Sequence, residues 1–381
     1  MNIIEYAAQN HNTFAEKPFG DIDSLILCQL FYAKMEDVLD GEGLSRTETG
    51  YTVKDFNKAE YFGSMFNDSI TDEKNKELST VCYASRRYRD IKVKNLYNDT
   101  NNNDDAAKQF AAVAFEIDDE TDYVCYRGTD GDMLGWEEDF DLAYKSVIPS
   151  QKSAVRYIEH FYGPGTEGET KKLIIGGHSK GGNLAVFGGI MCCDSIRRRV
   201  VKIYSHDGPG FRSETMHEIE ERLKEKPVAI CRQIPHASVV GMLLKSQIPC
   251  TVVKASAVGI MQHAAFTWEI EGDAFVEVDD VSESSRFIDG TLTQWLKSST
   301  DEEKELAVGL LFGFLKSQGI HTVQDMRNMR PRQIKALRDA IQGLDEDTRD
   351  IVDGLVKSLF RAAFDEMVPD FLKREEDNNI E

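Results

Sequence analysis

The sequence predicts an α/β fold in which a mostly parallel β-sheet is flanked by helices. Three observations lead to this prediction. From about residue 150 to about residue 256, short apolar segments alternate with helical patterns. Ser179 stands between glycines where one apolar segment passes into a helical pattern. After about residue 285 the strand-like segments stop, and only amphipathic helical patterns follow.

The N-terminal part begins with a helical pattern and continues with strands. Residues 21–40 are strongly apolar after an initial aspartate, which predicts one helix. Residues 91–97 alternate as a strand does, and the Asn- and Asp-rich residues 98–105 predict a turn. Two apolar segments joined by an acidic stretch, 109–117 and 123–126, predict a β-hairpin.

The alternating region supplies the other elements. Apolar segments predict strands at 172–176, 200–205, 228–234, 251–256 and 266–270. Helical patterns lie at 153–161, 182–193 and 213–225, and three more follow at 299–316, 322–340 and 345–364. We therefore expect a sheet-containing domain over residues 1–290 and a helical appendage over residues 291–381, ending in a disordered acidic tail.

Composition excludes several classes of function. The chain has 381 residues and a net charge of −21, so we expect no nucleic-acid partner, because binding to nucleic acid requires a basic surface. No window approaches the roughly 20 apolar residues of a membrane span, and the N-terminus lacks the pattern of a signal peptide. The seven cysteines form no CxxC pair and no HExxH motif occurs. We expect a cytoplasmic protein without metal or cofactor.

The candidate nucleophile is Ser179, in the segment Gly177-His-Ser-Lys-Gly181. A strand that turns sharply into a helix places this serine hydroxyl above the carboxyl edge of the sheet and at a helix N-terminus. Gly177 and Gly181 are needed because the neighbouring backbone passes too close for a Cβ. The alternative is an ordinary tight turn between a strand and a helix.

A serine nucleophile needs a base and an acid. His263 follows the strand at 251–256, which is the chain order that this architecture requires of the base. The strand before it ends without a carboxylate, so the nearest acid is Asp207, one strand earlier. Asp207 is alternatively a turn residue before Gly-Pro-Gly, in which case Ser238 would orient His263 through a neutral hydrogen bond. For the oxyanion, the backbone N–H groups of Lys180 and Thr129 are the candidate donors.

These motifs resemble two groups of proteins. Tyr-Arg-Gly-Thr129, Trp136, Asp139 and Gly-His-Ser179-Lys-Gly resemble the class 3 lipases, which have the α/β-hydrolase fold. The longer combination, with Asp-Gly-Pro-Gly, Ser-Val-Val-Gly-Met and Gln-His263, is more similar to the Mbeg1-like family (DUF2974) and covers about residues 1–290. The lipase resemblance implies that Asp139 holds the Thr129 hydroxyl. It places the acid near Ser238, where this sequence departs from the lipases.

Residues 131–146 occupy the place of a lipase lid. Four side chains at helical spacing are candidates for closing an acyl pocket, and the alternative is a helix packed permanently on the core. They are Met133, Leu134, Trp136 and Phe140. The ammonium of Lys180 either favours an anionic substrate group, or it is solvated or forms a salt bridge with the acidic surface.

We expect a serine hydrolase acting on carboxylic esters, lipid-like esters or thioesters. Its partner is then a small-molecule ester or lipid-like substrate, and the sequence leaves the oligomeric state open. Two alternatives remain. One is a catalytically degenerate hydrolase fold used for binding or as a scaffold, and the other is an acyltransferase.

Overall fold

The computed structural model describes residues 1–41, 50–67, 71–101, 107–282 and 299–364. Its centre is a seven-stranded sheet in the order β1-β2-β3-β4-β5-β6-β7. The first three strands are antiparallel, and β3 to β7 are parallel. The strands are β1 Lys92–Asn101, β2 Lys108–Glu116, β3 Thr121–Tyr126, β4 Lys172–His178, β5 Val200–His206, β6 Ala229–Pro235 and β7 Cys250–Val253. The predicted α/β fold with a mostly parallel sheet is confirmed.

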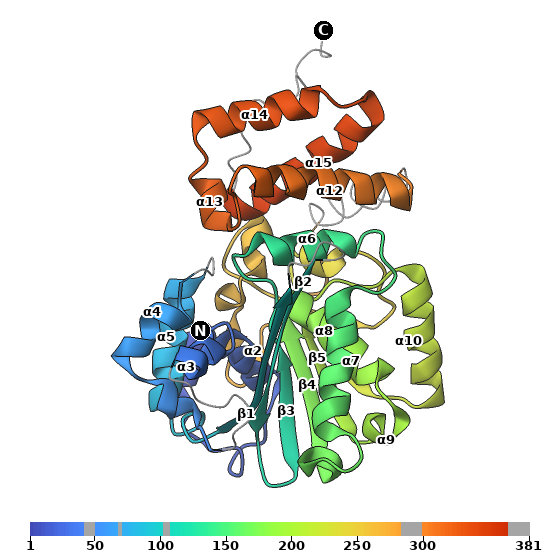
Figure 1. Cartoon of the computed structure of the whole chain (residues 1–381). Helices are drawn as coiled ribbons and strands as arrows, with labels where there is room; N and C mark the ends of the chain where they lie inside the picture. Colours follow the sequence, from blue (N-terminus) through green and yellow to red (C-terminus); the bar gives the residue numbers. More distant parts are fainter. Residues whose placement is uncertain (42–49, 68–70, 102–106, 283–298, 365–381) are drawn as a thin grey trace.

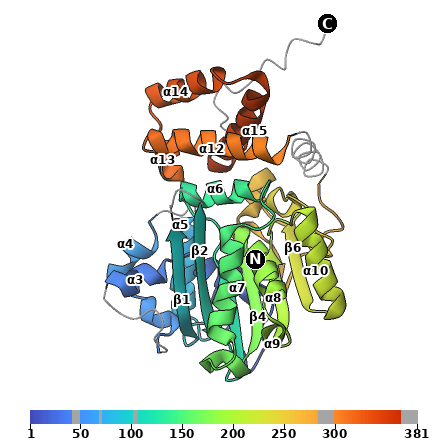
Figure 2. The ribbon, with the colours of Figure 1, turned by 45° about the vertical axis from the view of Figure 1, so that its right-hand side comes forward.

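Helices cover both faces of this sheet (Figure 1). One face carries α1 Ile3–Gln9, α2 Asp21–Leu30, α3 Met35–Gly41, α4 Phe62–Met65 and α5 Asp72–Ala84, with η1 Val53–Phe56 and η2 Ala59–Tyr61. The other face carries α7 Pro149–Tyr162, α8 Lys180–Met191, α9 Asp194–Arg197 and α10 Ser213–Glu225, with η3 Glu167–Thr170. Figure 2 shows α7 and α8 lying along the strands. Because both faces are covered, the parallel strands are apolar on both sides, and each face has its own core.

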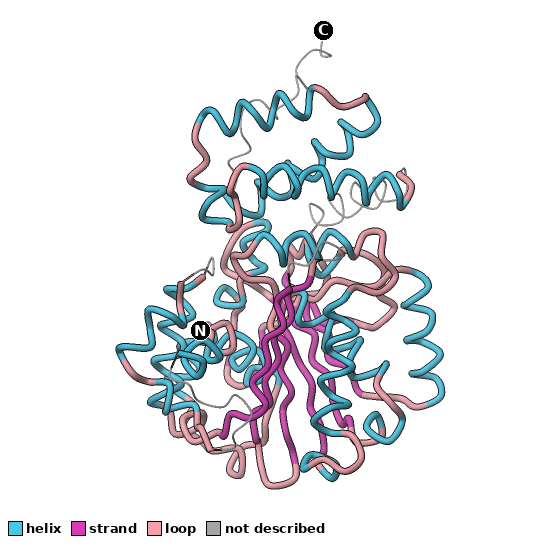
Figure 3. Tube along the Cα trace, viewed as in Figure 1, coloured by secondary structure: helices cyan, strands magenta, loops and turns pink. Residues whose placement is uncertain are grey.

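The remaining described elements of this part follow strands β3, β6 and β7 along the chain. They are α6 Met133–Asp141, η4 Val240–Met242, η5 Gly259–His263, η6 Ala265–Thr267, and the small hairpin of β8 Ile270–Glu271 and β9 Ala274–Phe275. The C-terminal helices are α12 Asp301–Ser317, α13 Val323–Arg327, α14 Pro331–Gln342 and α15 Glu346–Phe364. They stack above α6, as the separate group of helices in Figure 3 shows. The predicted domain boundary at residues 290 and 291, and the acidic tail, lie outside the described residues.

Two predicted helices are each divided in the structure. In the apolar segment 21–40, the first helix, α2, ends at Leu30, and a second helix, α3, begins at Met35. At the break, the Phe31 carbonyl accepts a hydrogen bond of 2.7 Å from Arg127 Nε, and Lys34 N–H donates to the Met65 carbonyl. The pattern at 322–340 breaks before Pro331, because proline disfavours helical geometry in the preceding residue and suits the first helical position.

Two predicted strand boundaries are also wrong. The Asn-rich stretch expected to turn at 98–105 continues β1 through Asn101, since the pairing with β2 outweighs the low strand propensity of Asn; residues 102–105 lie outside the described part. The strand expected at 266–270 is instead the 3₁₀ turn η6 followed by β8, which pairs only with β9. Trp268 between them is fully buried.

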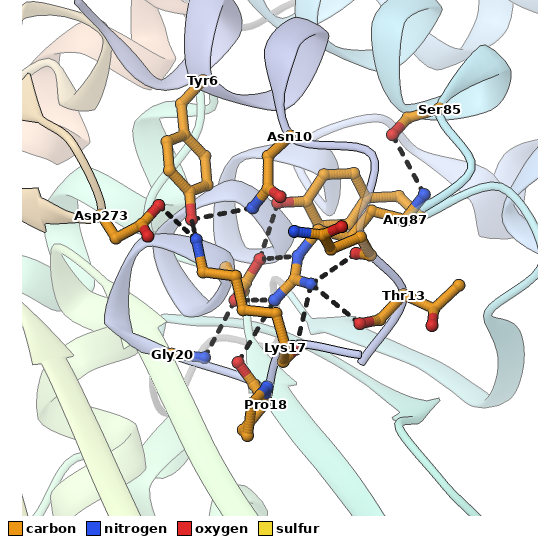
Figure 4. A network of polar contacts seen from close by, with 12 residues as sticks. Tyr6, Asn10, Thr13, Lys17, Pro18, Gly20, Ser85, Arg87 and Asp273 are labelled. Atoms are coloured by element: carbon orange, nitrogen blue, oxygen red, sulfur yellow. Dashed lines mark hydrogen bonds and ion pairs between the residues drawn. The ribbon is translucent and has the colours of Figure 1, made fainter. Parts of the chain in front are cut away.

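A buried ion pair holds the N-terminal segment against the rest of this face (Figure 4). Both guanidinium nitrogens Nε and Nη2 of Arg87 lie 2.7 Å from the Asp23 carboxylate. The Tyr88 hydroxyl donates to the same carboxylate, and Arg87 Nη1 donates to the carbonyls of Asn12 and Lys17. One arginine thus binds a loop and the helix start that follows it, both of which lie far before Arg87 in the sequence.

We predict that Arg87→Ala lowers the free energy of unfolding by about 3–5 kcal/mol, because it leaves the Asp23 carboxylate buried without a cation. Arg86→Ala is the matched control: Arg86 pairs with Glu16 at the surface, where such a pair contributes about 0–1 kcal/mol. Urea denaturation followed by circular dichroism measures both. Equal losses in the two variants would contradict the prediction.

Candidate active site

The nucleophile candidate Ser179 sits in a strained turn between β4 and α8. Its φ is 59° and its ψ is −133°, a region that L-residues rarely adopt. A Cβ on Gly177 would lie 2.1 Å from the Gly181 carbonyl, and a Cβ on Gly181 would lie 2.2 Å from the Tyr126 oxygen. Ser179 N–H donates to the His206 carbonyl at 2.9 Å. This is the local geometry expected of a nucleophile elbow.

His263 and Asp207 meet at the carboxyl edge of the sheet. His263 ends the short helix η5, and its Nδ1 lies 2.6 Å from Asp207 Oδ2. Asp207 directly follows β5 with a φ of 50° and is fully buried. A buried carboxylate at this distance keeps hydrogen on Nδ1, which leaves Nε2 of the imidazole to accept a proton.

Ser238 supports the acid rather than the base. Its hydroxyl donates to Asp207 Oδ1 at 2.5 Å, and Gly241 N–H donates to the same oxygen at 3.1 Å. A Cβ on Gly241 would lie 2.3 Å from Asp207 Oδ1, so only glycine allows this approach. Ser238 therefore does not bond His263 itself, as the alternative required. The Asp207 carboxylate contacts the imidazole, and the Ser238 hydroxyl contacts that carboxylate.

Ser179 and His263 are linked through the residue before the serine. Among the hydrogen bonds of the described residues, none joins the Ser179 hydroxyl directly to the His263 ring. The His178 and His263 rings lie with their centroids 4.7 Å apart, and His178 Nε2 lies 2.8 Å from the His263 carbonyl oxygen. The base is therefore packed against the elbow, and hydrogen bonds of a catalytic site commonly tighten only when substrate is bound.

The oxyanion candidate Thr129 lies in the turn after β3. A Cβ on Gly128 would lie 3.1 Å from Ser179 Cβ, which puts this turn against the elbow. The Thr129 hydroxyl donates to Asp139 Oδ2 at 2.6 Å. Burial raises the pKa of Asp139 to about 6, although the nearby Lys180 ammonium and the Thr129 hydroxyl oppose the rise. Asp139 thus occupies the position that the lipase resemblance implies.

Lys180, the residue after the candidate nucleophile, points into the protein. Its side chain is 1% exposed, and its Nζ lies 3.0 Å from Glu138 Oε2. Glu138 also accepts the N–H groups of Gln109 and Ser150, so its fully buried carboxylate is bonded on both oxygens. The ammonium also lies 3.8 Å from Asp139 Oδ1. Lys180 is thus neither solvated nor paired at the acidic surface, and its salt bridge is buried, which favours a structural role over contact with an anionic substrate group.

The segment in the place of a lid forms α6 and lies under the C-terminal helices. Met133 belongs to their apolar cluster, and Trp136 and Phe140 pack against it. The Phe140 ring lies 5.9 Å from that of Phe312. Leu134 is buried, and Met133 N–H donates to the His321 carbonyl. Three of the four apolar side chains thus face the appendage in this structure, and a role in closing an acyl pocket stays a prediction.

Sequence reasoning missed two residues of the site. His178 was treated only as an elbow residue, and Glu138 had no role. The unusual lysine after the nucleophile was the available signal for Glu138, since a lysine that begins a buried helix needs an anion near it. No sequence signal pointed to the contact between His178 and His263.

The described residues hold no group of three or more His, Cys, Asp or Glu side chains placed to bind a metal ion. In the same part of the chain, no helix has both the length and the apolar character needed to cross a membrane.

Comparison with known proteins assigns the family. The model of the Mbeg1-like family matches residues 82–313. The chain belongs to the Mbeg1-like family. This match spans the elbow, Asp207 and His263, and it extends into α12 of the appendage. No curated protein matches the chain.

Among solved structures, this Mbeg1-like chain is similar to fungal lipases. A fungal lipase–inhibitor complex is 12% identical, with 61% of this chain and 77% of that chain covered and a TM-score of 0.34. The Rhizomucor miehei lipase propeptide complex is 12% identical, with 62% and 68% covered and a TM-score of 0.34. The lipase from Rhizopus microsporus var. chinensis is 15% identical, with 56% and 72% covered and a TM-score of 0.33.

We predict that Lys180→Met lowers kcat/KM by the same factor for a neutral and for a carboxylate-bearing p-nitrophenyl ester, because the ammonium does not reach a substrate. Lys54→Met, which removes an exposed lysine paired with Asp90, is the control for loss of charge alone. A larger loss on the anionic ester would show that Lys180 contacts substrate.

A second prediction concerns pH. The pKa of Asp139 in the folded state, about 6, lies above its ordinary value of 3.8, so the protonated carboxyl favours the folded state and this contribution is lost as pH rises through about 6. Asp139→Asn does not titrate. Its Tm relative to the wild type should therefore increase between about pH 4 and pH 7. Asp90→Asn, at an exposed carboxyl whose pKa Lys54 lowers, is the control, and the same trend there would contradict the assignment.

Proposed function

We propose that this protein is a serine hydrolase that cleaves carboxylic esters. The observation that carries the proposal is the contact of 2.6 Å between His263 Nδ1 and the buried Asp207 carboxylate, beside a serine in a strained strand–helix turn. The Mbeg1-like family membership is consistent with this activity. An acid positioned in this way supports an active enzyme over the scaffold alternative, because a binding protein needs no carboxylate at this histidine.

The reaction follows from these positions. Ser179 Oγ attacks the ester carbonyl while His263 Nε2 takes its proton, and Asp207 stabilises the resulting imidazolium. The oxyanion accepts hydrogen bonds from the backbone N–H groups of Lys180 and Thr129. His263 then gives the proton to the leaving alcohol, and an acyl-enzyme forms. Water, deprotonated by His263, releases the acid and restores the Ser179 hydroxyl.

The surroundings of the base favour an ester with an apolar chain. Two loops flank the His263–Asp207 pair: one contains η4, whose Gly241 binds Asp207, and the other leads through η5 into His263. Val258 is 82% exposed and Met261 38% exposed. Partly exposed apolar side chains on the same two loops are Val239, Val240, Met242, Leu243, Leu244 and Ile260. An exposed apolar surface of this kind fits a hydrocarbon chain.

We predict that a fluorophosphonate probe labels Ser179 and that Ser179→Ala abolishes both labelling and hydrolysis of p-nitrophenyl esters. Asp207→Asn should lower kcat by about 10³- to 10⁴-fold, because the imidazole loses the tautomer and the counter-charge that it needs. Asp194→Asn, at an exposed aspartate on α9, should leave the rate unchanged. A folded wild-type protein that neither reacts with the probe nor cleaves an ester would favour the scaffold alternative.

A further inference from the structure

His178, the residue before the candidate nucleophile, is held in one tautomer. It ends β4 and is buried. Its Nε2 lies 2.8 Å from the His263 carbonyl oxygen, and because a carbonyl only accepts, Nε2 carries the hydrogen. Its Nδ1, 3.4 Å from the Tyr32 hydroxyl, then accepts from that hydroxyl. The two contacts define a neutral imidazole that donates on one side and accepts on the other.

The same side chain contacts His263 in a second way. The two rings lie 31° from parallel with centroids 4.7 Å apart. His263 is thus restrained at three points: at Nδ1 by Asp207, at its backbone carbonyl by His178 Nε2, and on a ring face by the His178 ring. Within its own short 3₁₀ helix, His263 follows the exposed Met261 and the buried Gln262, whose Oε1 accepts from Ala237 N–H and whose carbonyl accepts from Trp268 Nε1. The backbone before His263 is therefore anchored, and the contacts with His178 and Asp207 act on His263 itself.

The electrostatics of this contact require His178 to be neutral. In the described part of the chain, the titratable groups that face it are Tyr32, His206 and His263. Burial, followed by the positive charge of a protonated His263, lowers the pKa of His178 well below its usual value. Burial also lowers the pKa of His206 to about 3, so that neighbour is neutral as well. When His263 takes up a proton during the reaction, the rings of His178 and His206 therefore add no positive charge beside it.

We propose that His178 is a positioning residue for His263: its Nε2–H holds the His263 backbone, and its ring supports the imidazole while Asp207 binds the far edge. The proposal rests on the proposed function and adds to it a residue that touches neither substrate nor reacting atoms. Positioning matters because a displacement of about 1 Å in a catalytic group lowers a rate by about 10²-fold.

Three variants separate the two contacts. His178→Phe keeps a planar ring but has no donor, His178→Gln keeps an N–H donor but no ring, and His178→Ala has neither. The control is His236→Phe, because His236 Nδ1 also bonds a backbone carbonyl, that of Asp280, but at an exposed position. Active enzyme is counted by fluorophosphonate titration, so that a loss of folded protein does not appear as a loss of rate.

We predict that His178→Phe and His178→Ala lower kcat by about 10- to 100-fold with KM unchanged, that His178→Gln recovers part of the loss, and that His236→Phe behaves as wild type. Because the titration counts active enzyme, a purely structural role would leave kcat per active site unchanged in all three variants. Wild-type kcat in His178→Phe overturns the proposal.

One measurement does not depend on turnover. The proton on His263 Nδ1, shared with Asp207, gives a downfield ¹H NMR signal, and this signal should broaden by faster exchange in His178→Phe. If the wild type shows no activity but the signal still broadens, the proposed function fails while the contact between the two histidines stands. An active wild type with an identical signal in His178→Phe overturns the positioning role alone.

Discussion

The ion pair of Lys180 and Glu138 is the constraint on which the arrangement of the site depends. Lys180 is the first residue of α8, and its ammonium is buried. Glu138 receives it together with the N–H groups of Gln109 on β2 and Ser150 on α7, so one carboxylate joins four elements around the elbow. Neither charge is tolerable alone, because an unpaired buried ion costs several kcal/mol. The next residue along α6, Asp139, thereby reaches Thr129 in the oxyanion turn.

The helix that carries Glu138 also joins the C-terminal helices to the site. They pack on the apolar side chains of α6, namely Met133, Trp136 and Phe140. Backbone hydrogen bonds join Met133 to His321, and Val323 to Gly131 just before α6. An ion pair joins Lys316 to Glu137. Since α6 carries Glu138 and Asp139, the same helix contacts the C-terminal helices on one side and the elbow and the oxyanion turn on the other. The catalytic candidates themselves stand on loops at one edge of a sheet whose two faces are covered, which is the usual way for a rigid scaffold to hold a site.

Prediction from sequence succeeded where the signal was local and failed where a distant partner decided the outcome. The hairpin of β2 and β3, the strand before Ser179 and the helix α10 have clear patterns, and each stands where expected. The break after Leu30 was not predictable, because the Phe31 carbonyl is taken by Arg127, nearly a hundred residues away. The break before Pro331 could have been predicted from the proline itself, but the pattern at 322–340 was interpreted as a single helix.

The sequence by itself determined the sheet-and-helix alternation, the tight turn at Ser179 and the position of His263 after the last parallel strand, because glycine placement and chain order can be read along the chain. Only the tertiary structure decided between Asp207 and Ser238, since both follow strands that precede His263 and only three-dimensional distance shows which oxygen meets Nδ1. It likewise decided that Lys180 turns inward and that His178 lies against His263. Burial and hydrogen bonding join residues that are remote in the chain, and a linear pattern does not record them.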